Sequence, residues 1–140
     1  MPYKYGVNGK VVANQIKTEG KNIEIIDARA QLDNYVIFGV RACDNKSFEI
    51  LDRVFLVEPV DTMYKNKRDN AVIFTLACNN PQASCFCKVF DIDASSPKGD
   101  VECYYAGEYL YLNALTQKGE KVLSEINGLE DTSSNEVETL

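Results

Sequence analysis

Two segments that echo each other decide the fold: "VIFGVRAC" at residues 36–43 and "VIFTLAC" at residues 72–78. Each is a short apolar run, rich in β-branched residues, that ends on a cysteine. Runs that are apolar on both faces are typical of central strands in a mainly parallel sheet, which is covered on both sides. Ligands collect at the carboxyl ends of such strands. We therefore expect two parallel strands that bring Cys43 and Cys78 to one edge of a sheet.

The stretch between these strands, "DNKSFEILDRVFLVEPVDTMYKNKRD", predicts a helix. Apolar residues recur at helical spacing from Phe48 to Phe55, Asp44 is the expected N-cap, and Pro59 is expected to end the helix. A second short helix is expected over residues 61–67. A strand, a helix and a strand of these lengths form a right-handed βαβ unit.

The flanking segments complete the predicted fold. The N-terminal part is expected to contain a hairpin turn at Asn8-Gly9 and a strand over residues 22–28. Towards the C-terminus, "VECYYAGEYLYL" predicts a hairpin around Gly107 that presents a half-buried sheet face. "TQKGEKVLSEING" then predicts a helix with Thr116 as N-cap and Gly128 beyond its end.

The fold class predicted for the chain is α/β, a mainly parallel sheet with a central βαβ unit and a C-terminal hairpin plus helix. A length of 140 residues suits one hydrophobic core. We expect a single α/β domain over residues 1–128 and an acidic, Ser/Thr-rich tail over residues 129–140.

Composition and charge exclude several classes of function. The formal net charge of −6 and the lack of a basic stripe argue against nucleic acid as a partner. No apolar run approaches the ~20 residues that span a bilayer, and no signal peptide opens the sequence, so we expect a cytoplasmic protein without a membrane partner. The chain contains no histidine, which excludes Ser-His and Cys-His catalytic pairs and zinc sites with histidine ligands.

With histidine chemistry excluded, the five cysteines are the main candidates for a functional site. In a cytoplasmic protein, clustered thiols more often bind metal or do redox work than form disulfides. The βαβ unit and the loop after it would bring four of them together, and four thiolates suit a [4Fe–4S] cluster or a structural zinc ion. These expected metal ligands are Cys43, Cys78, Cys85 and Cys87. Cys103, in an apolar hairpin, is expected to be a small buried hydrophobe.

Two charged residues flank the first of these cysteines. Arg41 and Asp44 are candidate cofactor-binding residues, because a cation beside a thiolate lowers its pKa and helps to hold a negatively charged cluster. An ordinary surface pair at a strand end is the alternative for these two side chains. A further alternative for the thiols is a redox enzyme or sensor, with Cys85 and Cys87 as an attacking and a resolving pair.

The segments "VIFGVRACDNKSFEILDRVFL", "YKNKRDNAVIF" and "ACNNPQASCFC" resemble the iron–sulfur subunits of the anaerobic sulfite reductase A and sulfhydrogenase β type. These cytoplasmic electron-transfer subunits carry "GVRPCD…DRVF" and "NC…P…CFC" segments in the same order. A ferredoxin-like domain with two [4Fe–4S] clusters follows or accompanies them. The resemblance runs from about Val36 to Cys87, and by position it matches the same four cysteines.

The chain departs from the family pattern in ways that limit the expected function. Ala42 stands where the family often has proline, and the C-x2-C-x2-C-x3-C run of ferredoxins is absent from the sequence. The resemblance implies one domain of a longer subunit, which binds an iron–sulfur cluster and passes electrons to other subunits or to a ferredoxin-like domain. It implies an anaerobic oxidoreductase complex and no substrate site in this chain. A zinc-binding structural or interaction domain is the alternative reading.

Overall fold

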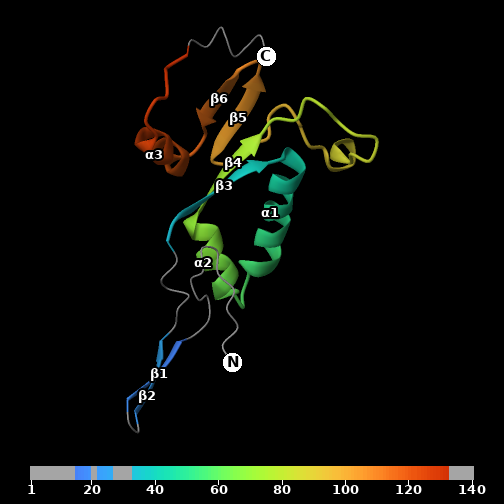
Figure 1. The fold of residues 1–140 in the computed structure, drawn as a ribbon. Helices are drawn as coiled ribbons and strands as arrows, with labels where there is room; N and C mark the ends of the chain where they lie inside the picture. The colour runs from blue at the N-terminus through green and yellow to red at the C-terminus, as the bar shows by residue number, and fades with distance from the viewer. Residues whose placement is uncertain (1–14, 20–21, 27–32, 133–140) are drawn as a thin grey trace.

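The computed structural model describes residues 15–19, 22–26 and 33–132 (Figure 1). Strands β1 (Gln15–Glu19) and β2 (Asn22–Ile26) pair antiparallel as a separate two-stranded sheet. The strand predicted over residues 22–28 is therefore present as β2. The turn predicted at Asn8-Gly9 lies outside the described residues.

The main sheet has four strands in the order β3-β4-β5-β6. They are β3 (Tyr35–Val40), β4 (Ala71–Leu76), β5 (Val101–Ala106) and β6 (Tyr109–Ala114). β3 pairs parallel with β4, β4 pairs parallel with β5, and β5 and β6 form the antiparallel hairpin predicted around Gly107. This arrangement confirms the α/β fold class with its mainly parallel sheet.

Helix α1 (Ala42–Phe55) follows β3 directly, and this corrects one expectation from the sequence. The N-cap is Arg41 and not Asp44 as predicted. Arg41 has an extended backbone conformation, and its carbonyl accepts a hydrogen bond from the Asn45 N–H at 2.8 Å. The helix begins this early because Ala42 is buried at the strand end, only 5% exposed. Asp44 lies in the first turn, where a carboxylate complements the helix dipole. The helix ends at Phe55, before Pro59.

Two shorter helices complete the structure, and both begin at side-chain caps. The second helix predicted from the sequence is α2 (Thr62–Asn70), where the Asp61 carboxylate accepts the Tyr64 N–H at 2.9 Å. In α3 (Gln117–Glu125) the predicted cap is confirmed, because the Thr116 hydroxyl accepts the Gly119 N–H at 3.2 Å. Of the predicted tail, only residues 129–132 are described, and they form neither helix nor strand. Among the described helices, none has the length and apolar character needed to cross a bilayer.

The hydrophobic core lies between the sheet and α3. Because side chains alternate along a strand, β4 presents one set to α3 and the other to the opposite face, on the α1 side of the sheet in Figure 1. Thr75 and Ile73 are buried on that second face. The α3 side consists of Val72, Phe74, Val101 and Cys103, with Val122 and Leu123 of α3 packed against them. Cys103 is 0% exposed, which confirms its predicted role as a small buried hydrophobe.

Strand β3 contains a β-bulge shortly before its carboxyl end. The pairing with β4 shifts between Phe38 and Val40, and the residue between them, Gly39, has φ +83°. A side chain is strained at this φ, so glycine suits the position. The bulge sets the direction in which Arg41 and the first turn of α1 leave the sheet.

Candidate metal centre

The two strands of the βαβ unit end at the same edge of the sheet, and the predicted metal ligands gather there. Cys43 is the second residue of α1, and Cys78 follows the end of β4. The connection from β4 to β5 leaves the end of the sheet at which α1 begins (Figure 1). It carries Cys85 in a loop and Cys87 as the first residue of the short 3₁₀ helix η3 (Cys87–Phe90).

All four cysteines line one cavity of about 390 Å³. Cys43, Cys78 and Cys87 are partly buried and Cys85 is exposed. The remaining lining residues are small or polar, with one cation: Arg41, Ala42, Asn80, Gln82 and Ala94. The structure therefore brings together the side chains that the sequence nominates, from three separate segments of the chain.

The donor set fits an iron–sulfur cluster in kind, because four thiolates are the usual ligands of a [4Fe–4S] cluster. In the described part of the chain, no three histidine, cysteine, aspartate or glutamate side chains are arranged to hold a single metal ion. A zinc ion needs its sulfurs within about 2.3 Å of one point. In a [4Fe–4S] cluster each thiolate binds its own iron, so the four sulfurs do not converge on one point.

Cys43 lies at the start of α1, next to Asp44 and close to Cys87. Burial raises the pKa of this thiol, and the Asp44 carboxylate and the nearby Cys87 raise it further. The backbone N–H groups of Asp44 and Cys43 oppose this rise by hydrogen bonding to the sulfur. A metal that binds here must displace the thiol proton, so binding is coupled to proton release.

Cys85 and Gln82 close a tight turn through two hydrogen bonds. The Cys85 N–H donates to the Gln82 carbonyl at 3.0 Å, and the Gln82 N–H donates to the Cys85 sulfur at 3.2 Å. A hydrogen bond to a ligating sulfur stabilises its negative charge, which is one way in which proteins tune iron–sulfur clusters. The loop supplies this donor before any metal is bound.

The backbone of Cys78 is fixed by pairing beyond the end of β4. The Ala77 N–H donates to the Cys103 carbonyl at 2.9 Å, and the Cys78 N–H donates to the Ala94 carbonyl at 2.9 Å. Ala94 belongs to the loop that precedes β5. The position of Cys78 therefore depends on how that loop is anchored.

Glu102 anchors this loop, a role that no motif in the sequence predicts. Its carboxylate, on a residue only 5% exposed, accepts hydrogen bonds from the Lys98 N–H at 3.0 Å, the Ser96 hydroxyl at 3.1 Å and the Tyr104 hydroxyl at 2.9 Å. A buried carboxylate requires such partners. The one available signal was an acidic residue within the apolar run "VECYY".

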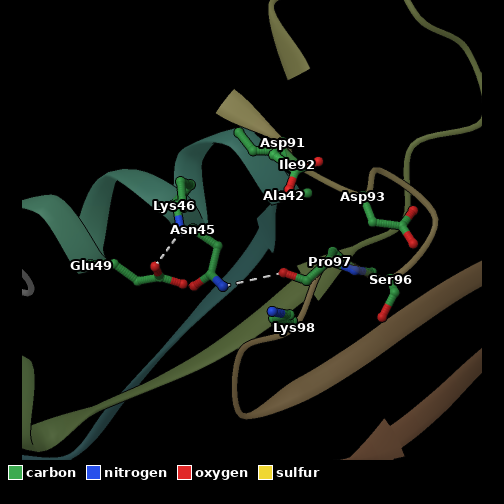
Figure 2. A pocket seen from close by; sticks show the side chains of 10 residues that line it. All are labelled: Ala42, Asn45, Lys46, Glu49, Asp91, Ile92, Asp93, Ser96, Pro97 and Lys98. Carbon is green, nitrogen blue, oxygen red and sulfur yellow. Dashed lines mark hydrogen bonds and ion pairs between the residues drawn. The ribbon is translucent and has the colours of Figure 1, made fainter. Parts of the chain in front are cut away.

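A smaller cavity of about 100 Å³ lies between α1 and the same loop (Figure 2). Across it the Asn45 side-chain amide donates to the Pro97 carbonyl at 3.2 Å, and Lys46 pairs with Glu49 at 2.6 Å beside it. The Asn45 hydrogen bond fastens the helix that carries Cys43 to the loop that holds Cys78. We interpret this region as a structural support that keeps two walls of the cysteine cavity, the helix and the loop, in place.

Of the two charged residues that the sequence nominates, Arg41 lines the cavity. Its Nη1 donates to the Ala77 carbonyl at 3.0 Å, which links the end of β3 to the end of β4. Asp44 lies beside Cys43 and acts on its pKa, but it does not belong to the cavity lining. Its role as a cofactor-binding residue stays a prediction.

Comparison with known proteins gives one informative similarity. Over 67 residues, 48% of this chain, the sequence is 39% identical to sulfhydrogenase 2 subunit beta of Pyrococcus furiosus. The match covers 20% of that protein, so the chain corresponds to about a fifth of its relative. No family model matches the chain, and no solved structure matches it. Over about half of its length, the chain is thus similar to a hydrogenase subunit.

Proposed function

We propose that this domain binds a [4Fe–4S] cluster and transfers electrons within a hydrogenase-type complex. The proposed ligands are Cys43, Cys78, Cys85 and Cys87. The observation that carries the proposal is that these side chains, from three segments of the chain, line one cavity. Similarity to sulfhydrogenase 2 subunit beta supports the oxidoreductase setting.

The four-thiol donor set suits a [4Fe–4S] cluster, and a structural zinc ion is the alternative. No three potential ligands among the described residues converge on the position of one ion. The cavity of about 390 Å³ leaves room between the thiols, and its small lining residues Ala42 and Ala94 keep that room open. A compact inorganic cluster would occupy such a space.

When bound, the cluster supplies a one-electron carrier. Backbone N–H groups of the protein stabilise negative charge on the cysteine sulfurs. The Gln82 N–H donates to the Cys85 sulfur at 3.2 Å, and backbone N–H groups at the start of α1 act to lower the pKa of Cys43 against the effect of its burial. Partial burial of three of the cysteines limits water access. We assign no catalytic residue.

The expected partner is another subunit or a ferredoxin-like domain in the cytoplasm, and the surface next to the cysteines suits its approach. Phe86, Val89 and Phe90 flank Cys85 and Cys87, and they are 51%, 80% and 51% exposed. Exposed apolar side chains in a group mark sites of protein contact. Because electron transfer slows steeply with distance, a redox partner must dock beside the ligands.

Anaerobic reconstitution with iron and sulfide tests the cluster. We expect a brown protein with about four irons per chain, and a loss of iron and colour when any of the four proposed ligands is changed to serine. Cys103→Ala is the matched control, because it removes a buried thiol outside the cavity and is expected to retain the iron.

Other results would overturn the proposal. A colourless protein with one tightly bound zinc ion would support the structural alternative. If Cys85→Ser and Cys103→Ala retained equal amounts of iron, the assignment of Cys85 would be wrong. A metal-free chain that forms a reversible bond between Cys85 and Cys87 in its working cycle would support the thiol-redox alternative.

A further inference from the structure

The lining of the cysteine cavity is unbalanced in charge. The chain has 21 acidic and 15 basic residues, yet no carboxylate lines this cavity among the described residues. Apart from the thiols, the lining consists of Ala42, Asn80, Gln82, Ala94 and the cation Arg41. Within the described part of the chain, Arg41 is the one cation in this lining and favours negative charge inside the cavity, whereas the Asp44 carboxylate beside Cys43 opposes it.

Arg41 also occupies a specific place in the fold. It is the last residue before α1 and lies two residues before Cys43 in the sequence. Its Nη1 donates to the carbonyl of Ala77, the residue before Cys78, at 3.0 Å. One side chain therefore connects the two strand ends from which the first two cysteines emerge.

We propose that Arg41 is a positioning residue with two roles: its hydrogen bond ties the ends of β3 and β4 together, and its charge favours the reduced state of the bound cluster. This inference rests on the proposed function. Reduction adds one electron from an external donor and makes the site more negative by one charge, and no bond to Arg41 forms or breaks. A nearby cation stabilises the more negative state, so it raises the reduction potential.

Solvent limits the size of this effect. Arg41 is exposed to water on one side, which screens its charge. We therefore expect its removal to change the ratio of reduced to oxidised protein by no more than about tenfold, equivalent to about 59 mV for one electron.

The test measures the midpoint potential of the cluster-loaded protein by anaerobic titration with a chemical reductant. Arg41→Met removes the charge and the donor but keeps a long side chain, and its potential should fall. Arg41→Lys keeps the charge, and its potential should stay near that of the parent. Arg53→Met is the matched control, because Arg53 lies exposed in the last turn of the same helix. Its potential should equal that of the parent.

Hydrogen exchange in the metal-free protein tests the tie between the strand ends. The amides of Ala77 and Cys78 donate to Cys103 and Ala94, and both should exchange faster in Arg41→Met than in Arg53→Met. Equal exchange in the two variants would overturn the positioning role.

The possible failures are distinguishable. A parent protein that takes up no iron would overturn the proposed function and this inference together. A parent that holds its cluster, with equal potentials in Arg41→Met and Arg53→Met, would overturn the charge role alone. Equal falls in Arg41→Lys and Arg41→Met would also overturn it, because the charge would then not be the cause.

Discussion

The amide of Cys78 donates a hydrogen bond to the carbonyl of Ala94 at 2.9 Å, across a connection that contains the two other cysteines of the loop. The ends of this connection are thereby held together next to the sheet. The loop around Ala94 is in turn fixed by Glu102 of β5 and by Asn45 of α1. The cysteine cavity therefore depends on hydrogen bonds made by residues that are not themselves candidate ligands.

Replacing Glu102, which anchors the loop beside Cys78, should lower the stability of the fold. Glu102→Ala leaves the Lys98 N–H and the Tyr104 hydroxyl without their acceptor in a partly buried region. We expect the free energy of unfolding to fall by about 2–3 kcal/mol, measured by urea denaturation. Glu108→Gln is the control, since Glu108 is exposed at the hairpin turn. Equal unfolding midpoints for the two variants would contradict the anchoring role.

The buried thiol of Cys103 predicts a loss of stability at alkaline pH. Burial raises its pKa from 9.0 to about 11. Below pH 9 both the folded and the unfolded chain hold the proton, so the stabilisation is complete. Between pH 9 and 11 the unfolded chain loses the proton while the folded chain keeps it, so stability falls as the pH rises. We expect this thiol to account for a loss of about 1–3 kcal/mol.

Denaturant unfolding of the metal-free protein at several pH values measures this contribution. Tyrosines with raised pKa also respond at high pH, so the comparison is with Cys103→Ala, which lacks only the thiol. The difference in unfolding free energy between parent and variant should shrink as the pH rises above 9. Parallel pH profiles would show that Cys103 is not the cause.

The Cys43 thiol should react slowly in the metal-free protein. Its pKa is raised, first by burial and then by the Asp44 carboxylate, so the reactive thiolate is scarce at pH 8. Asp44→Asn removes one of these causes, and we expect alkylation of Cys43 by iodoacetamide to become several-fold faster. Peptide mass spectrometry measures the rate, and Glu108→Gln removes a distant negative charge as the control. An unchanged rate in Asp44→Asn would argue against this coupling.

The Tyr64 hydroxyl should contribute to the contact between α1 and α2. Tyr64 donates to Asp52 Oδ1 at 2.6 Å, and the same carboxylate accepts Arg68 Nε at 3.2 Å. Tyr64→Phe should lower the free energy of unfolding by about 1 kcal/mol, because the aromatic ring stays and only the hydrogen bond is lost. Tyr109→Phe, at a residue 70% exposed, should leave it unchanged. If both variants unfold at the same urea concentration as the parent, the hydrogen bond contributes nothing.

Much of the fold followed from local patterns in the sequence. The echoing apolar runs predicted the parallel pair β3 and β4, and the turn at Gly107 predicted the β5–β6 hairpin. Thr116 was predicted correctly as a cap because its effect reaches only three residues along the chain. Asp44 was predicted wrongly as a cap, since burial of Ala42 starts the helix before it.

The sequence by itself determined the fold class and named four thiols as candidate ligands, because strand periodicity and cysteine spacing are local properties of the chain. Only the tertiary structure decided that these thiols border one cavity, that Arg41 reaches Ala77 and that Glu102 holds the loop beside Cys78. These contacts join residues far apart in sequence. Glu102 finds its partners because a buried carboxylate must be paired, whereas Arg41 reaches Ala77 because the parallel strands β3 and β4 end side by side, and no local pattern encodes either contact.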